Sequence, residues 1–109
     1  NNGGIAFNNY LNGNVLLDYI FINNVKISRY SWHGILILGV NGESGYKNVN
    51  IDNAQIFDCN QGGIIVQNTV GFDSYCFYNI NITNSKIYGN QGRPDLPSSY
   101  GDGILLGNI

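Results

Sequence analysis

The residues best suited to chemistry are basic and aromatic side chains that recur at related positions. Four of the five basic residues fall on one predicted side of the molecule: Lys26, Arg29, Lys86 and Arg93. Three aromatic residues fall beside them: Trp32, Phe57 and Tyr88. Aromatic rings stack on sugar faces, and ammonium or guanidinium groups bind carboxylates or sulfates. This combination predicts a binding site for an acidic sugar chain, and the alternative is an ordinary solvated strand.

His33 and Asp102 are the residues most able to exchange protons or hold a ligand. The internal repeat aligns His33 with Gly62 and then with Asp102, so two strand spacings, roughly 9.6 Å, separate the two side chains. That distance is too long for a direct hydrogen bond, but a substrate or metal ion could bridge it. The alternative is that both are turn residues without a chemical role.

Acidic residues do not pair in the predicted register. Asp58 is expected beside Arg29 on one neighbouring strand and Gly89 on the other. No pair of carboxylates forms there for acid and base roles in glycoside hydrolysis. Arg29 and Asp58 could instead form a surface ion pair of little energetic value.

A repeat of about 29 to 31 residues positions all of these side chains. One phrase recurs as Gly34–Ile37, Gly63–Val66 and Gly103–Leu106, with a degenerate copy at Gly4–Phe7. A second phrase recurs as Ile20–Ile27, Val49–Ile56 and Ile80–Ile87. Repeats of this length are typical of solenoids, in which each unit packs only against its neighbours.

Each repeat contains three pieces in which apolar and polar residues alternate at period two, the pattern of a β-strand. In the repeat that begins near Gly34, the apolar residues of the three pieces are Ile35 and Ile37, then Val49 and Ile51, then Ala54 and Ile56. Asn and Gly lie between the pieces, where left-handed backbone conformations are needed. The sequence therefore predicts an all-β solenoid of about three to four triangular, parallel coils.

Stacking of the coils predicts which residues meet. Three inward isoleucine ladders are expected: Ile22, Ile51 and Ile82; Ile27, Ile56 and Ile87; Ile35, Ile64 and Ile104. Asn24, Asn53 and Asn84 are expected to form an inward ladder at one corner, where their amides satisfy backbone groups. An apolar outer column is also expected, of Ala6, Leu36, Ile65 and Leu105. Such a column predicts a cover over the Leu36, Ile65 and Leu105 face, which is a flanking domain, a second protomer or the loop between Val66 and Tyr78.

The phrase from Asn48 to Val66 resembles the repeat of right-handed parallel β-helix proteins. That superfamily includes pectate lyases, polygalacturonases, chondroitinase-like lyases, phage tailspikes and many bacterial surface proteins. The resemblance implies a right-handed, single-stranded parallel β-helix in an extracellular or cell-surface protein of bacteria, with polysaccharide as a partner. Calcium is a possible cofactor through the resemblance to pectate lyases alone, since the residues themselves indicate none.

The hydrolase branch of this superfamily is similar only in part. Its members use a Gly-His-Gly phrase and an Arg-Ile-Lys phrase. This chain has Trp32-His33-Gly34 at the first place and no Arg-Ile-Lys phrase. The resemblance therefore implies the fold more specifically than it implies catalysis.

Composition limits the partners. Charged residues make up 11% of the chain and the net charge is −2, which argues against a nucleic-acid partner. No apolar run reaches the length of about 18 residues that spans a bilayer, so no transmembrane segment is expected. Cys59 and Cys76 occupy different points of the repeat, which favours buried free thiols over a disulfide.

Residues 1–109 are expected to be part of one parallel β-helix domain that is uncapped at both ends. The long segment from Gly92 to Asp102 is expected to form either a binding surface or a structural spacer. The predicted function is that of a fragment of an extracellular or surface protein that binds or processes polysaccharide. As an enzyme it would be a polysaccharide lyase or glycoside hydrolase with key residues outside the fragment, and the alternative is a non-enzymatic adhesin, stalk or scaffold.

Overall fold

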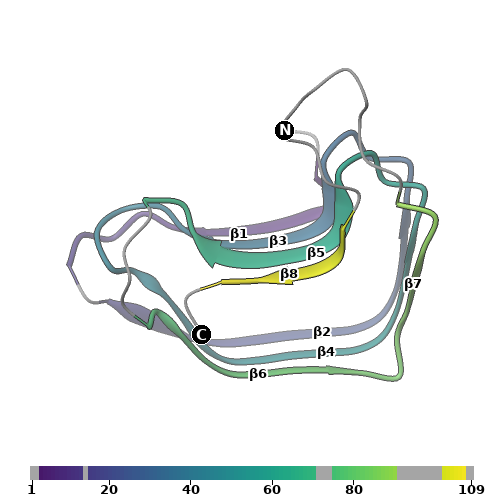
Figure 1. Ribbon diagram of the computed structural model, residues 1–109. Coiled ribbons are helices and arrows are strands. Elements are labelled where there is room, and N and C mark those ends of the chain that lie inside the picture. Colours follow the sequence, from purple (N-terminus) through teal and green to yellow (C-terminus); the bar gives the residue numbers. More distant parts are fainter. Residues whose placement is uncertain (1–2, 14, 71–74, 91–101, 108–109) are drawn as a thin grey trace.

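The computed structural model describes residues 3–13, 15–70, 75–90 and 102–107, and strands are its only regular elements within these ranges (Figure 1). They are β1 (Ile5–Asn9), β2 (Leu16–Ser28), β3 (His33–Gly39), β4 (Gly45–Phe57), β5 (Gly62–Asn68), β6 (Phe77–Thr83), β7 (Lys86–Tyr88) and β8 (Asp102–Leu106). The prediction of an all-β chain is confirmed. No helix in the described ranges is long and apolar enough to cross a membrane.

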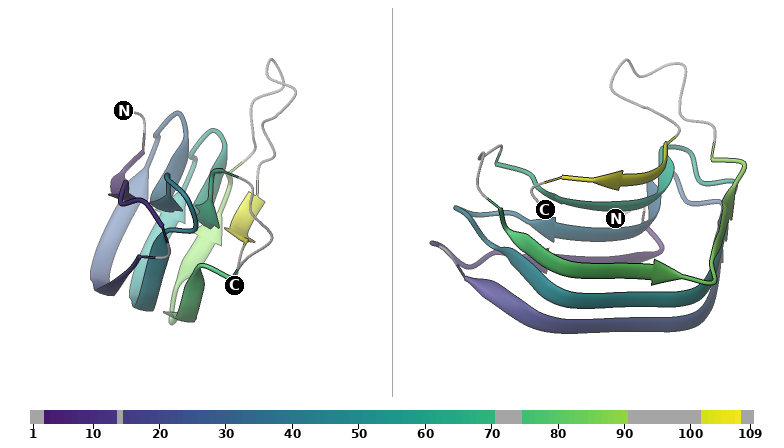
Figure 2. Two further views of the ribbon diagram at one scale, coloured as in Figure 1. Left: turned by 90° about the vertical axis from the view of Figure 1, so that its left-hand side faces the viewer. Right: turned by 60° about the horizontal axis from the view of Figure 1, so that its bottom comes forward.

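The strands form two parallel sheets that face each other. One sheet has the order β1-β3-β5-β8, and the other has the order β2-β4-β6 with β7 also paired to β4. The chain passes from one sheet to the other after each long strand, and Figure 2 shows the strands of each sheet following one another in chain order. Side chains from both sheets meet in one core.

The predicted isoleucine ladders are confirmed in register. Ile22 pairs with Ile51 and Ile51 with Ile82; Ile27 pairs with Ile56 and Ile56 with Ile87; Ile35 pairs with Ile64 and Ile64 with Ile104. The middle members are fully buried, and each contributes about 1.5 to 3 kcal/mol through removal of its apolar surface from water. Phe7, Tyr46 and Phe77 extend the core as an aromatic column.

The second and third predicted pieces of each repeat are joined in two of the three cases. β2 and β4 run through the corner without a break, whereas β6 and β7 are separate strands. Asn24 and Asn53 turn the corner in the left-handed region, with φ of 58° and 54°. At the third corner the Ala54 N–H donates to the Ser85 hydroxyl at 3.1 Å, so a side chain replaces the backbone ladder.

The prediction of an inward asparagine ladder is wrong. Asn24, Asn53 and Asn84 are exposed, because a left-handed residue at this bend carries its side chain outward. The Asn53 amide still donates to the Asn24 carbonyl at 2.6 Å, but Asn84 donates to the Asp52 carboxylate at 2.9 Å. These hydrogen bonds lie on the surface and do not satisfy buried backbone groups.

Two buried asparagines, Asn9 and Asn68, lie at the ends of β1 and β5. The Asn9 amide donates to the carbonyls of Val15 and Gly45 at 2.9 and 2.8 Å. The Asn68 amide donates to the carbonyls of Gly42 and Ser44, both at 2.9 Å. Gly39 lies in register between the two asparagines, and a Cβ there would clash with the Ser44 carbonyl. The pair therefore holds the turn between β3 and β4 from both neighbouring coils.

Cys59 and Cys76 are both buried and are not joined in a disulfide, as the sequence favoured. Burial raises the pKa of the Cys76 thiol above its usual value, and the nearby Glu43 carboxylate raises it further. Both thiols act as small apolar core residues.

Candidate functional site

Two of the four predicted basic residues, Lys26 and Lys86, lie with the aromatic residues Phe57 and Tyr88 on the outer surface of β2, β4 and β7. Lys26, Gln55 and Lys86 form one outward column, and Phe57 and Tyr88 form the column beside it. Both lysines and the Tyr88 ring are exposed. We call this surface the basic face.

The rings of the basic face are already partnered. Phe57 and Tyr88 stack with centroids 5.2 Å apart and planes 3° from parallel. The Lys26 ammonium lies 5.7 Å from the Phe57 centroid, and the Gln55 amide donates to the Tyr88 hydroxyl at 2.8 Å. Phe57 thus contacts Tyr88 and Lys26 and has little ring face left for a sugar. The face offers exposed cations rather than a stacking platform.

The remaining charges of this region lie at a corner. Arg29 and Asp58 have φ of 66° and 56° and are exposed. Among the described residues an ion pair forms between Lys47 and Asp18, at 4.0 Å, and not between Arg29 and Asp58. Arg93 lies outside the described residues, so its predicted place on the basic face stays a prediction.

A second feature is a groove on the outer surface of β3 and β5, with a volume of about 190 Å³. Its lining residues come from two adjacent coils: Trp32, His33, Leu36, Leu38, Gln61, Ile65, Gln67 and Thr69. Leu36 and Ile65, from the predicted apolar outer column, provide the apolar part, and Trp32 has 45% of its surface exposed. We call this feature the outer groove.

Backbone hydrogen bonds fix both ends of the outer groove. The Gln61 N–H donates to the Trp32 carbonyl at 3.2 Å, which ties the aromatic turn to the next coil. The Thr69 N–H and hydroxyl both donate to the Gly39 carbonyl, at 2.8 and 3.3 Å. Polar side chains therefore border the groove on rigid positions, which favours recognition of a ligand of defined shape.

At the start of the apolar outer column, the chain near Gly3 packs on Leu36. Leu36 is only 5% exposed, and Gly3 lies so close that a Cβ there would clash with the Leu36 side chain. Ala6, at the start of the same column, is exposed. A flanking domain, a second protomer or the loop after Val66 stays a prediction, and residues 71–74 of that loop lie outside the described residues.

His33 and Asp102 occupy the predicted register. His33 pairs with Gly62 and Gly62 with Asp102 in the first sheet. His33 is only 4% exposed, so it is buried at the end of the outer groove and does not lie on an open turn. The Asp102 backbone belongs to β8, and its side chain lies outside the described residues.

No group of three or more His, Cys, Asp or Glu side chains with the arrangement of a metal site occurs within the described ranges. Calcium, which only the resemblance to pectate lyases implies, stays a prediction. Asp52 is the carboxylate with a resolved change, since hydrogen bonds from Asn84 and Thr83 lower its pKa. It lies on β4 before the corner at Asn53, whereas the β4 residues of the basic face, Gln55 and Phe57, follow that corner.

Sequence reasoning identified Trp32, His33 and the Leu36 column but missed Gln61, Gln67 and Thr69. The sequence could have identified Gln67, because the register that aligns Leu36 with Ile65 also aligns Leu38 with Gln67.

Comparisons of the chain with protein-family models, with curated proteins and with solved structures found no match. Inference about function therefore starts from the geometry of the outer groove and the basic face.

Proposed function

We propose that this chain is part of a right-handed, single-stranded parallel β-helix in an extracellular or cell-surface protein of bacteria, and that it binds polysaccharide in the outer groove. The parallel, in-register sheets joined strand by strand support the helix. The observation that carries the function is an exposed indole beside an apolar floor and a border of amides and a hydroxyl.

The chemistry of the outer groove suits a sugar ring. The C–H face of a pyranose packs on an aromatic ring, and its hydroxyls need partners that both donate and accept hydrogen bonds. Trp32 supplies the ring, while Gln61 and Gln67 supply amides with both functions. A volume of about 190 Å³ is small beside the pockets of drug-sized ligands, so one ring of a longer chain would enter.

Binding is favoured over catalysis at this groove. None of its described lining residues carries a carboxylate, and glycoside hydrolysis needs a pair of them. An enzyme of the lyase or hydrolase class would need groups outside the outer groove. The basic face would add contacts to an acidic chain, and its exposed cations would make that part of the affinity sensitive to salt.

A glycan array tests the proposal with three proteins: wild type, Trp32→Ala and the double variant Lys26→Ala/Lys86→Ala. We expect wild type to bind a defined set of glycans and Trp32→Ala to lose roughly five- to thirtyfold in affinity, because stacking contacts of this kind are worth roughly 1 to 2 kcal/mol. The double lysine variant should bind neutral glycans as wild type does and should have a lower affinity for any acidic glycan. Equal binding by wild type and Trp32→Ala would contradict the proposal.

A scaffold in an adhesin or stalk is the second candidate, supported by the polar ladder on the outer surface of the second sheet. Asn79 donates to Asn48 and Asn48 to Asp18, each at 2.8 Å. Together with the Phe57 and Tyr88 stack, these bonds join successive coils on the outside. Absence of binding to any glycan would favour this candidate.

A further inference from the structure

Positive charge is concentrated on one part of the surface, although the net charge of the chain is −2. Lys26 and Lys86 are exposed on the basic face, and Arg29 is exposed at the corner that follows it. Asp58 brings a carboxylate to the same corner, but within the described ranges none of the three cations forms an ion pair. The basic face therefore presents cations that a ligand can bind.

The basic face is also rigid. The Lys26 ammonium lies 5.7 Å from the centroid of the Phe57 ring, which stacks on Tyr88. Phe57 is half-buried, and its strand β4 pairs with strands on both sides. A cation that is already held against a fixed ring loses less conformational freedom on binding than a lysine in solvent, and this favours affinity.

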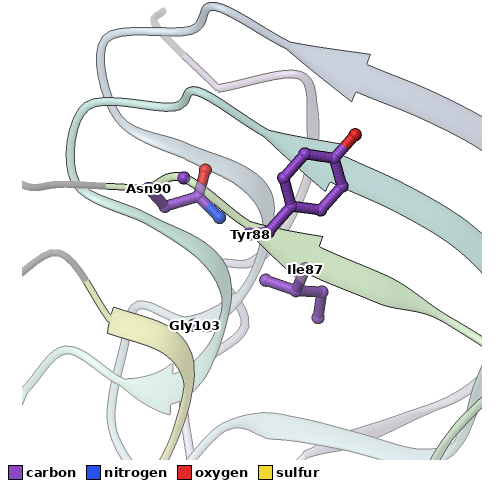
Figure 3. Close-up of a pocket in the computed structure, with 5 residues that line it drawn as sticks. Ile87, Tyr88, Asn90 and Gly103 are labelled. Atoms are coloured by element: carbon purple, nitrogen blue, oxygen red, sulfur yellow. The ribbon is translucent and has the colours of Figure 1, made fainter.

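The Tyr88 hydroxyl adds a hydrogen-bond donor that faces outward. Figure 3 shows the Tyr88 ring and the Ile87 side chain on opposite sides of β7, so the hydroxyl lies away from the core. Its oxygen accepts a hydrogen bond from the Gln55 amide at 2.8 Å. A phenol that accepts one hydrogen bond can still donate its own proton, so Tyr88 can donate to an anionic oxygen. Lys86 lies two residues earlier on the same strand, so its ammonium projects from the same face as the Tyr88 hydroxyl.

We propose that the basic face binds an acidic polysaccharide on its own, with the polymer lying along the stack of coils. Lys26 and Lys86 occupy the same position of two coils that are separated by the coil of Gln55. Two strand spacings, roughly 9.6 Å, therefore separate their strand positions, so two anionic groups spaced along one polymer match them better than a single anion. Tyr88 would donate its proton to the anionic group beside Lys86.

This inference goes beyond the proposed function, because it gives the protein a second site on another side of the coil. The outer groove lies on β3 and β5, whereas the basic face belongs to β2, β4 and β7. The groove takes a sugar ring through uncharged contacts, and the basic face takes an acidic chain through charge-assisted hydrogen bonds. The two sites are therefore expected to fill independently.

Other polyanions fit this face less well. Anionic membranes are recognised by clusters of about four to eight Lys and Arg residues, and the described residues bring three to this region. Nucleic-acid partners favour strongly basic domains, whereas the net charge of this chain is −2. The exposed cations instead suit a polymer with widely spaced charges.

Dextran sulfate is the direct probe, and dextran, which lacks only the sulfate groups, is its matched control. Binding to the 109-residue chain is measured by isothermal titration calorimetry, with carboxymethyl dextran to distinguish carboxylates from sulfates. We expect saturable binding of at least one of the two acidic polymers, and it should weaken as salt rises, because exposed charge contacts are screened. No binding of either acidic polymer, or equally tight binding of dextran, would overturn the proposal. Equally tight binding of phosphatidylserine vesicles would overturn it in favour of a membrane surface.

Two lysine variants with the same change in net charge locate the site. Lys86→Ala should weaken binding of the acidic polymer roughly three- to fivefold, whereas Lys47→Ala, which removes a lysine already paired with Asp18, should change it less than about twofold. Tyr88→Phe keeps a ring to stack on Phe57 and should lose roughly three- to tenfold, the ratio for one hydrogen bond. Equal losses in the two lysine variants would overturn the basic face as the site, and unchanged binding by Tyr88→Phe would overturn the role of its hydroxyl.

Trp32→Ala separates this inference from the proposed function. Its affinity for the acidic polymer should equal that of wild type, because the indole lies in the outer groove. A loss in Trp32→Ala without a loss in Lys86→Ala would place the acidic polymer in the outer groove and overturn the second site.

Discussion

Replacement of Asn68 by alanine should destabilise the protein far more than replacement of any exposed corner asparagine. Asn68 is 4% exposed, and its amide holds the carbonyls of Gly42 and Ser44. Its side-chain carbonyl also accepts the Val70 N–H at 2.8 Å. Alanine would leave all three backbone groups without this partner.

The expected cost follows from the surroundings of each group. Ser44 is fully buried, so loss of its bond carries the full penalty of about 1 to 3 kcal/mol for an unsatisfied buried group. Gly42 is half-buried and Val70 is exposed, so water replaces part of those bonds. The sum is about 2 to 4 kcal/mol, which lowers the melting temperature by roughly 10 to 25 °C for a domain of this size.

Urea unfolding followed by circular dichroism measures the difference in unfolding free energy between wild type and variant. Asn53→Gly is the matched control, because Asn53 is exposed and its φ of 54° suits glycine. It should cost less than about 1 kcal/mol. A small effect of Asn68→Ala, or an equal effect of the two variants, would refute the conclusion that the buried asparagines Asn9 and Asn68 hold the turn between β3 and β4.

Three further predictions concern packing, ionisation and thiol access. Gly34→Ala should lower the free energy of unfolding by about 1 to 3 kcal/mol, because its Cβ would clash with the Ile56 side chain and come within 3.1 Å of the Gly63 carbonyl. Gly103→Ala should be nearly neutral, and similar losses of stability in the two variants, measured by thermal unfolding, would contradict the packing described. Burial raises the pKa of Tyr46 and of Cys76, so the unfolded chain releases these protons first and stability should fall as pH rises above about 9; a flat profile from pH 7 to 11 would contradict this. Cys59 and Cys76 should react with a thiol reagent only when the chain unfolds, so immediate labelling of the native protein would show that they are not buried.

The repeat made the sheet register predictable. Ile22, Ile51 and Ile82 stand at equal places in three copies, and stacking of equal units fixes their contacts whatever the shape of the corners. The corners were harder. Asn53 was expected to point inward because asparagine can form ladders, but the left-handed backbone that asparagine tolerates turns its side chain outward. The structural role of Asn9 and Asn68 was missed because Gly39 lies between them in register, so the aligned repeats show no column of asparagines at this position.

The candidate site was predicted in parts. Trp32 was grouped with Phe57 and Tyr88 because all three are aromatic and near basic residues in the repeat. The structure places Trp32, in the turn before β3, with Gln61 and Gln67 at the outer groove, and stacks the other two rings on each other on the second sheet. Alternation gives the face of a residue within a strand, but a turn residue such as Trp32 has no such period to follow.

The most direct test of polysaccharide binding in the outer groove uses the fluorescence of Trp32, which is the only tryptophan of the chain. Titration with neutral oligosaccharides of the types retained on the glycan array should shift its emission to shorter wavelength and saturate, because a sugar would displace water from an indole that is 45% exposed. The shift should be the same at low and high salt, since no ionic contact is involved. An emission spectrum that stays constant while a glycan binds elsewhere on the protein would contradict binding in the outer groove.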